Sequence, residues 1–183
     1  MSIDLRQIFR ALAFAAEKHR RQRRKDTDAS PYINHPVAVA HVLAVEASVS
    51  DVPTLVAAIL HDTVEDTETT AEELAQLFGP EIAALVTELT DDKSLPKQAR
   101  KQLQIARAAA ASPQAKRLKL ADKICNVRDV TANPPLGWSR ERRLEYLEWA
   151  VRVAAGCRGV DPALDALFDA TLRRGREALC AEP

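Results

Sequence analysis

Six prolines divide most of this chain into segments whose sequences are typical of helices. The prolines stand at positions 36, 53, 80, 96, 113 and 162. Proline fits the first turn of a helix, because its missing N–H has no partner to lose there, and it disrupts a helix interior. Ser112 and Asp161 each precede one of these prolines and are suitable N-caps. The pattern therefore predicts a series of separate helices.

Other start signals and the spacing of apolar residues support this interpretation. Thr70 with Glu73 forms a capping box, and Ser139 can cap another helix. Apolar residues recur at three- and four-residue spacing, as at Val56 and Ile59, and we find no alternating strand pattern and no internal repeat. The predicted helices cover Leu5–Gln22, Pro36–Ala47, Pro53–Asp66, Ala71–Phe78, Pro80–Leu89, Lys97–Ala111, Pro113–Thr131, Arg140–Ala155 and Pro162–Leu179.

Length and composition favour one all-α domain. The chain has 183 residues, which is the size of a single domain that buries a substantial core. It contains only 5 glycines and 4% aromatic residues, a balance that favours helices over sheets. We therefore predict that residues 1–183 form a single compact domain of about eight to ten helices.

Charge and cysteine content exclude several classes of protein. The 26 basic and 26 acidic residues cancel, which argues against a protein that coats nucleic acid. No apolar run approaches the roughly 20 residues that span a bilayer, and the first residues lack the pattern of a signal peptide. Cys125, Cys157 and Cys180 show no metal-type spacing, so we expect mostly buried, reduced thiols and a cytoplasmic location.

A cluster of ionisable side chains ends the apolar segment LVAAILHDTVEDT, residues 55–67. It contains His61, Asp62, Glu65 and Asp66, which span an arc of roughly 140° on a continuous helix. Carboxylates this close repel one another unless a cation or solvent compensates. Histidine nitrogen with carboxylate oxygen suits Mn²⁺, Fe²⁺ or Zn²⁺ better than Ca²⁺. For this segment alone, a solvated acidic helix end is the commoner explanation.

Two residues elsewhere in the chain could complete a metal site. His35 lies in PYINHP, where a histidine by itself is more often a capping or packing residue. Asp122 lies in RLKLADKICNVRD among apolar residues, and an unpaired buried carboxylate is costly, so it needs a partner. That partner could be a metal ion, Lys123 or Arg128. Asn126 lies one turn later on the same face and could orient the carboxylate or bind a ligand.

The order His35, then His61-Asp62, then Asp122 resembles the H…HD…D signature of the HD phosphohydrolase superfamily. More narrowly, the chain resembles the hydrolase domain of RelA/SpoT enzymes, in the single-domain type represented by the metazoan SpoT homologue. The resemblance covers about residues 5–178 and rests on the segments RRKD, SPYINHP, HDTVEDT, TDDKSLPK, KLADKICNVRD and EYLEWA.

This resemblance implies an HD-domain fold and an alarmone hydrolase that depends on Mn²⁺, with Fe²⁺ or Zn²⁺ as other candidate ions. Such enzymes remove pyrophosphate from the ribose 3′ position of (p)ppGpp and yield GDP or GTP. The implied metal ligands are His35, His61, Asp62 and Asp122. Glu65 and Asp66 match the acidic pair that positions and activates the attacking water. A carboxylate suits that task when it reaches the water without ligating the ion.

Several further residues are predicted to contact the anionic substrate. The resemblance assigns Arg24, Lys25 and Asn126 to the nucleotide. Lys97 follows TDDKSLP and could reach a phosphate, and Arg142 and Tyr146 share one helix face. We interpret Arg20, Arg21 and Arg143 as solvent-exposed charges.

The residues leave two other functions open. The chain could remove a 2′- or 3′-phosphate from another nucleotide such as NADPH, because the metal site recognises phosphate while specificity lies in the pocket walls. It could also be a non-catalytic nucleotide sensor that keeps the fold. A small-molecule nucleotide is the expected ligand in each case, without a nucleic acid or a membrane. Oligomeric state stays open.

Overall fold

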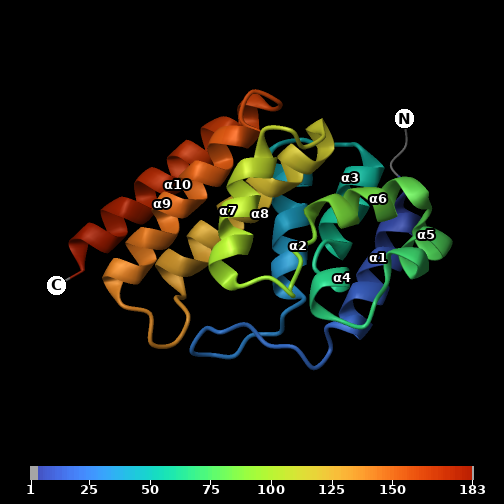
Figure 1. Ribbon diagram of the computed structural model, residues 1–183, viewed down its shortest axis with the longest axis horizontal. Helices are drawn as coiled ribbons and strands as arrows, with labels where there is room; N and C mark the ends of the chain where they lie inside the picture. Colours follow the sequence, from blue (N-terminus) through green and yellow to red (C-terminus); the bar gives the residue numbers. More distant parts are fainter. Residues whose placement is uncertain (1–3, 183) are drawn as a thin grey trace.

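The computed structural model describes residues 4–182, and this part of the chain is helical throughout, apart from its loops and one isolated bridge between Arg23 and Pro31 (Figure 1). The elements are α1 (Leu5–Lys18), α2 (Asn34–His41), the π-helical turn η1 (Val42–Glu46), α3 (Val52–Leu60), α4 (Thr63–Asp66), α5 (Ala71–Phe78), α6 (Pro80–Leu89), α7 (Lys97–Ala108), α8 (Pro113–Ala132), α9 (Arg140–Cys157) and α10 (Pro162–Ala181). The all-α prediction is confirmed.

The helix starts follow from the predicted caps. The hydroxyl of Ser112 accepts a hydrogen bond from the Ala115 N–H at 3.2 Å, and the Asp161 carboxylate accepts from two N–H groups of α10. Thr70 caps α5 by accepting from Glu73 N–H, at 3.2 Å. The Glu73 side chain does not complete the capping box, because its carboxylate binds the Lys18 ammonium at 3.0 Å instead.

Two predicted helices end earlier than expected. The first stops at Lys18 rather than at Gln22, because the His19 ring turns inward and is 2% exposed. The ring packs on Tyr32, with centroids 4.9 Å apart, and its Nδ1 lies 2.6 Å from Gln22 Oε1. The α7 helix ends at Ala108, three residues before its predicted end.

The predicted helix over residues 53–66 is broken, and the break lies at the functional cluster. The α3 helix ends at Leu60, His61 and Asp62 form a turn, and α4 begins at Thr63. The Thr63 hydroxyl donates to the carbonyl of Leu60 at 2.7 Å, which helps hold the turn. The expectation of one continuous helix face was therefore wrong, because the turn redirects Glu65 relative to His61.

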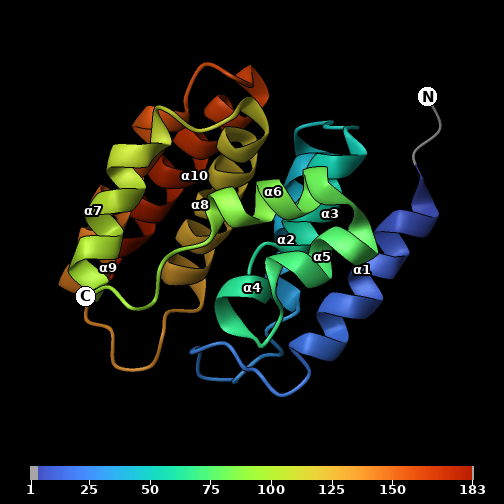
Figure 2. The same ribbon diagram turned by 45° about the vertical axis from the view of Figure 1, so that its right-hand side comes forward.

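The α8 helix is the central element that joins the two halves seen in Figures 1 and 2. It packs against α9 and α10 on one side and against α2, α3 and α6 on the other. One hydrophobic core runs through the molecule, from Ala11 in α1 to Leu179 in α10. A side chain on the face of α8 turned toward α2 and α3 therefore meets residues from the first third of the sequence.

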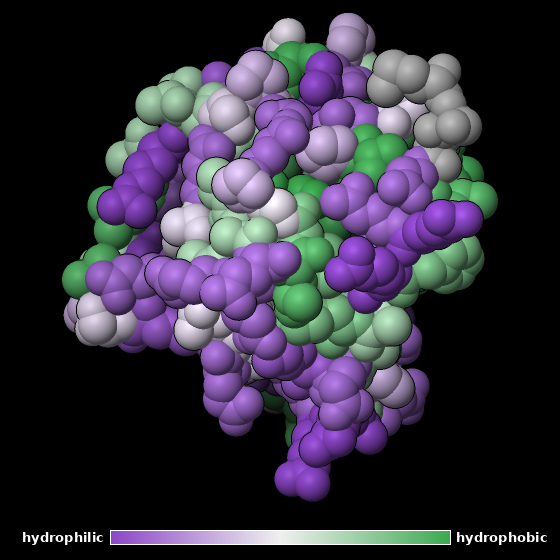
Figure 3. Space-filling view, turned by 90° about the vertical axis from the view of Figure 1, so that its right-hand side faces the viewer, coloured by the Kyte–Doolittle hydropathy of each residue, from purple (hydrophilic) through white to green (hydrophobic). Residues whose placement is uncertain are grey.

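The surface corrects one predicted role. Arg143 is only 8% exposed, not solvated, because it forms a two-pronged ion pair with Glu182 near the C-terminal end of α10. On the face turned to the viewer in Figure 3, apolar residues lie among hydrophilic ones. Among the exposed apolar residues of the molecule, Leu5 and Phe9 of α1 are 60% and 65% exposed. Across residues 4–182, no helix combines the length and apolar character needed to cross a bilayer.

The close contact of α7 with α9 generates a stability prediction. A Cβ at Gly156 would lie 2.6 Å from Ala108 Cβ and 2.8 Å from the backbone nitrogen of Ala109. We expect Gly156→Ala to lower the free energy of unfolding, because overpacking costs about 1–3 kcal/mol and exceeds the roughly 1 kcal/mol gained from removing a helical glycine. Urea unfolding followed by circular dichroism measures the change.

The neighbouring exposed residue provides the matched control. Ala155→Gly alters helix propensity without touching α7, and we expect it to cost about 1 kcal/mol. A Gly156→Ala protein more stable than the parent would show that the two helices are not in close contact.

Candidate metal centre and substrate cavities

The centre is built from four residues on three segments of the chain. His35 lies in the first turn of α2, His61 and Asp62 form the turn after α3, and Asp122 lies in the middle of α8. One ligand atom each from His35, His61 and Asp62 lie within 4.8 Å of one another. The tertiary structure thus brings together residues that are up to 87 positions apart in the sequence.

Asp122 approaches these three residues from α8. Its Oδ1 lies 3.1 Å from His35 Nε2 and 4.0 Å from His61 Nε2. Asp62 Oδ2 lies 3.1 Å from His61 Nε2 and 3.8 Å from His35 Nε2. All four side chains predicted as ligands therefore turn toward one point.

Neighbouring groups orient three of these four side chains, whereas His35 Nδ1 is buried without a hydrogen-bond partner in residues 4–182. His61 Nδ1 donates to the carbonyl of Ala58 at 2.8 Å, so the lone pair of its Nε2 faces the centre when the ring is neutral. The Tyr32 hydroxyl donates to Asp62 Oδ2 at 2.7 Å. The carboxylate of Asp122 accepts from Asn126 Nδ2 at 2.6 Å. Such partners orient ligands and typically change metal affinity by about 10- to 100-fold.

Lys123 is the remaining partner of Asp122. Its ammonium lies 2.8 Å from Asp122 Oδ2 and 4.6 Å from the centroid of the Trp149 ring. The local ion pair considered from sequence is therefore present, but it engages only one carboxylate oxygen. The other oxygen faces the two histidines, so the ion pair and a metal ligand role are compatible.

The charges at the centre are strongly coupled. Burial alone would lower the pKa of His61, but the carboxylates of Asp62 and Asp122 outweigh it and raise this pKa to about 9. Burial would raise the pKa of Asp62, yet the adjacent His61 and His35 rings hold it well below its usual range. Because the carboxylates of Asp62 and Asp122 favour the positively charged form of His61, a metal cation is also favourable at this position.

The donor set fits a divalent transition metal. Two imidazole nitrogens and two carboxylate oxygens are the mixed ligands that suit Mn²⁺, Fe²⁺ or Zn²⁺. The carboxylates and the proton of His61 show that the centre attracts positive charge. His35, His61 and Asp62 form a group that could hold such an ion.

The four residues open into a cavity of about 150 Å³. Glu65 lines it and accepts a hydrogen bond from Asp91 N–H at 3.1 Å, while its other oxygen lies 3.8 Å from Arg100. Burial raises the pKa of Glu65, and nearby Asp62 adds to the effect. Glu65 thus lies beside the predicted ligands without approaching them as a fifth one.

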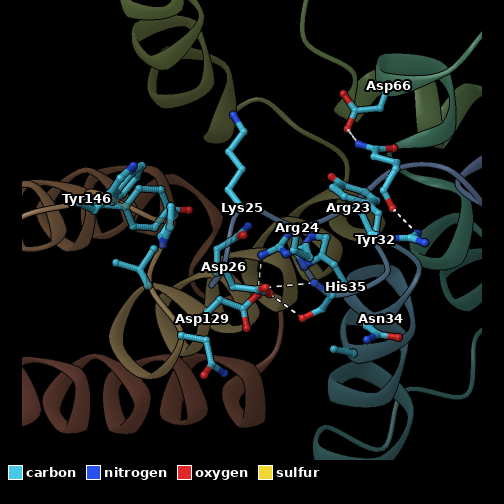
Figure 4. Close-up of a pocket in the computed structure, with 18 residues that line it drawn as sticks. Arg23, Arg24, Lys25, Asp26, Tyr32, Asn34, His35, Asp66, Asp129 and Tyr146 are labelled. Atoms are coloured by element: carbon cyan, nitrogen blue, oxygen red, sulfur yellow. Dashed lines mark hydrogen bonds and ion pairs between the residues drawn. The ribbon is translucent and has the colours of Figure 1, made fainter. Parts of the chain in front are cut away.

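Asp66 faces a different space from Glu65. It lines a second, larger cavity, where its carboxylate accepts from Gln22 Nε2 at 2.9 Å (Figure 4). The same carboxylate also pairs with Lys93. The broken helix causes this separation, because α4 carries the two acidic residues away from the direction of α3. The acidic pair predicted to act together is divided between two cavities.

The larger cavity has a volume of about 590 Å³ and contains most of the predicted substrate contacts. Arg24, Lys25, Asn126 and Tyr146 all line it, and it shares His35 and Asn126 with the metal cavity. In Figure 4, Tyr146 and Asp66 lie on opposite sides of this space. The predicted nucleotide contacts therefore adjoin the predicted metal ligands.

Lys97 and Arg142 lie outside both cavities. Lys97 is exposed at the start of α7, and Arg142 is exposed on α9 with its guanidinium 4.4 Å from the Trp138 ring centroid. Neither lines the space in which the other predicted contacts gather. Their assignment as phosphate contacts stays a prediction without support from cavity geometry.

The structure also adds residues that the sequence did not reveal. Tyr32, Gln22 and Asp129 all line the larger cavity. Tyr32 donates a hydrogen bond to the carboxylate of Asp62, and Gln22 donates one to Asp66. Asp129 forms an ion pair with Arg24. The segment PYINHP already contained Tyr32, but nothing in its spacing indicated that the hydroxyl reaches Asp62. Trp138 lines the larger cavity as well.

Metal binding should depend on pH in a defined direction. Because His61 holds a proton with a pKa of about 9, an ion that binds near neutral pH must displace it. We expect the apparent Mn²⁺ affinity to rise about tenfold per pH unit between about pH 6.5 and 8. Calorimetry in buffers of different ionisation enthalpy should detect about one released proton per ion. A pH-independent affinity would contradict this arrangement.

The hydroxyl of Tyr32 should tune the same affinity. We expect Tyr32→Phe to weaken Mn²⁺ binding by about tenfold, because Asp62 loses its hydrogen-bond donor. Tyr146→Phe removes a hydroxyl from the same cavity that contacts no ligand carboxylate, so Mn²⁺ affinity should be unchanged. Calorimetric titration compares the two variants, and equal affinities would refute a role for the Tyr32 hydrogen bond.

Comparisons with known proteins agree with this geometry. A model of the HD domain family matches residues 11–147. Guanosine-3′,5′-bis(diphosphate) 3′-pyrophosphohydrolase MESH1 of Homo sapiens is 50% identical over 165 residues, which cover 90% of this chain and 92% of that protein. The enzyme of the same name from Drosophila melanogaster is 50% identical over 163 residues, covering 89% of this chain and 91% of the relative.

Solved structures give the same result. The structure described as a metazoan ortholog of SpoT that hydrolyzes ppGpp matches with a TM-score of 0.89 and 48% identity, covering 92% of this chain and 94% of that one. A protein of Listeria monocytogenes matches with a TM-score of 0.64 and 28% identity, covering 80% of this chain and 99% of that one. The chain therefore belongs to the HD-domain hydrolases and, among them, to the SpoT-like group that includes MESH1.

Proposed function

We propose that this protein hydrolyses the 3′-pyrophosphate of (p)ppGpp, with Mn²⁺ as its metal, and releases pyrophosphate with GDP or GTP. The observation that carries the proposal is the adjacency of two cavities, which share His35 and Asn126. One holds the predicted metal ligands, and the other is large enough for a nucleotide and contains Arg24 and Lys25. The names of the relatives at 50% identity agree with this activity.

His35, His61, Asp62 and Asp122 would hold the ion. A divalent ion supplies charge stabilisation to a phosphoryl group and makes water a better nucleophile near neutral pH. The mixed nitrogen and oxygen donors suit Mn²⁺, Fe²⁺ and Zn²⁺, and among these the family resemblance points to Mn²⁺. The paired partners of the ligands, Tyr32 and Asn126 among them, keep these side chains in place before the substrate arrives.

Glu65 is our candidate for the general base. It lines the metal cavity, and the N–H of Asp91 holds one of its oxygens. Burial raises its pKa toward neutrality, where a carboxylate accepts a proton from water more effectively. Asp66 lines the nucleotide cavity instead and is held by Gln22 and Lys93, so we assign it to shaping that cavity.

The larger cavity provides a cationic and aromatic surface for the nucleotide. The guanidinium of Arg24 lies 5.6 Å from the centroid of the Tyr32 ring and pairs with Asp129, which holds it in a defined plane. A guanidinium plane held in this way can stack on a base. Lys25 and Asn126 line the same cavity and can contact phosphate and ribose oxygens. Tyr146 closes one side of it.

We further propose that residues 1–183 act as one domain in a reducing compartment such as the cytoplasm. The continuous core from Ala11 to Leu179 supports the first point. Cys125, Cys157 and Cys180 are free thiols, which supports the second; two are buried as expected, and Cys180 is exposed.

Turnover of ppGpp by the Mn²⁺-loaded protein tests the activity. We expect release of pyrophosphate, and a loss of about 10²-fold or more in kcat for Glu65→Gln, because removing a general base typically costs 10²- to 10⁴-fold. His61→Ala should lose both activity and Mn²⁺ binding, whereas Glu65→Gln should keep the metal. That difference separates a proton acceptor from a ligand.

A panel of phosphorylated nucleotides provides the control for substrate. ppGpp, pppGpp and NADPH are compared by kcat/KM under the same conditions. Faster turnover of NADPH than of ppGpp would overturn the substrate assignment and keep the reaction class. A metal-free protein that binds ppGpp without turnover would instead identify a sensor.

A further inference from the structure

The single-turn helix α4 carries Glu65, and a distant loop holds this side chain in place. A helix of one turn is not stable by itself, because its few hydrogen bonds do not offset the cost of nucleation. Both acidic side chains of α4 are bound by the loop over residues 90–96, which joins α6 to α7. The backbone N–H of Asp91 donates to Glu65 Oε2 at 3.1 Å, and the Lys93 ammonium pairs with Asp66. The direction of Glu65 therefore depends on the position of this loop.

The two oxygens of the Glu65 carboxylate have different surroundings. Oε2 is engaged by the N–H of Asp91. Oε1 accepts no hydrogen bond from any group in residues 4–182, and its ion-pair partner Arg100 lies 3.8 Å away. A carboxylate oxygen without a close donor is available to accept a proton from water. The hydrogen bond from Asp91 therefore leaves Oε1 as the oxygen that can serve the attacking water.

Gln104 of α7 fixes the position of Asp91. Its Nε2 donates to Asp91 Oδ2 at 2.7 Å, and both side chains line the metal cavity. Only the amide nitrogen can face a carboxylate, because the amide oxygen would repel it, so this contact also sets the orientation of the amide. Gln104 Oε1 has no hydrogen-bond partner in the part of the chain that the structure describes. The bond to Asp91 is therefore the polar contact that Gln104 contributes.

The other hydrogen bonds of the loop are local. Asp92 accepts from the N–H and hydroxyl of Ser94 at 2.9 and 2.6 Å, and the Thr90 hydroxyl donates to the carbonyl of Val86 at 2.9 Å. These contacts shape the loop, but they do not connect it to α7. The side chain of Gln104 makes that connection, so it links a long helix to the short one that carries Glu65.

We propose that Gln104 is a positioning residue for the reaction, because it holds Asp91 and thereby directs Glu65 Oε1 toward the attacking water. The inference rests on the general-base role of Glu65 in the proposed function. Gln104 makes no hydrogen bond to a predicted metal ligand within residues 4–182, and it does not line the nucleotide cavity. Its loss should therefore slow the chemical step and leave the binding of metal and nucleotide unchanged.

Steady-state kinetics of the Mn²⁺-loaded protein with ppGpp test this separation. For Gln104→Met we expect kcat to fall about 10- to 100-fold, because misplacing a catalytic group costs up to about 10²-fold, while KM for ppGpp and Kd for Mn²⁺ stay within about twofold. Gln102→Met is the matched control, since Gln102 is exposed on the same helix outside both cavities, and it should behave like the parent. An unchanged kcat in Gln104→Met, or an equal loss of Mn²⁺ affinity, would overturn the proposal.

Hydrogen exchange of the Asp91 amide gives a readout that does not depend on turnover. Exchange followed by NMR without substrate should be at least about tenfold faster in Gln104→Met, because the N–H bound to Glu65 opens more often. The Gln102→Met protein should exchange at the rate of the parent. An Asp91 amide that exchanges equally fast in Gln104→Met and the parent would show that Gln104 does not hold the loop.

The two members of this hydrogen bond should not act independently. Asp91→Ala removes the carboxylate and keeps the backbone N–H, so its kcat should fall as in Gln104→Met, and the double variant should lie within about twofold of either single one. Asp91→Asn, whose Oδ1 can still accept from Gln104, should keep kcat within about threefold of the parent. Losses that multiply in the double variant, or an Asp91→Asn protein as slow as Asp91→Ala, would refute the proposal. Because Asp91 lies in a loop, these variants decide the question even if Gln104→Met does not fold.

The results also separate this inference from the proposed function. A parent protein that does not hydrolyse ppGpp would refute the function, whereas the Asp91 exchange rates still decide whether Gln104 holds the loop. A parent that hydrolyses ppGpp while Gln104→Met keeps its kcat would refute only the role of Gln104.

Discussion

The attraction between two buried histidines and two partly buried carboxylates is the constraint on which the rest of the site depends. His35 and Asp122 meet at 3.1 Å, and His61 and Asp62 meet at the same distance. Each isolated charge would be costly in this interior, so the four groups stabilise one another or an ion. Because Asp122 comes from α8 and His35 from α2, the contact also ties the central helix to the first third of the chain.

This electrostatic arrangement explains why the surrounding polar residues are so specifically placed. Tyr32 and Asn126 each donate to a ligand carboxylate, and Lys123 neutralises the oxygen of Asp122 that faces away from the histidines. Each carboxylate therefore keeps one oxygen directed at the centre. The same low exposure that strengthens these contacts raises the pKa of Glu65, so the ligand site and the proposed base follow from one environment.

The two cavities give the site a direction. They share His35 and Asn126, so a ligand in the nucleotide cavity adjoins the predicted metal ligands. Aromatic and basic groups such as Arg24 and Tyr146 line the large cavity, while the small one is lined by the two histidines and the carboxylates of the candidate metal centre. A ligand with an aromatic base at one end and phosphates at the other matches this order better than a symmetrical anion does.

The sequence alone predicted most of the helices and the four residues of the candidate metal centre. Prolines and caps such as Ser112 and Asp161 act locally, so α5 and α6 could be predicted to the residue, and the spacing of His61-Asp62 was visible in the chain. Only the tertiary structure decided the turn after Leu60, the separation of Glu65 from Asp66 and the burial of Arg143. These features depend on contacts between residues far apart in the sequence, and short-range patterns do not encode which side chains meet across a core.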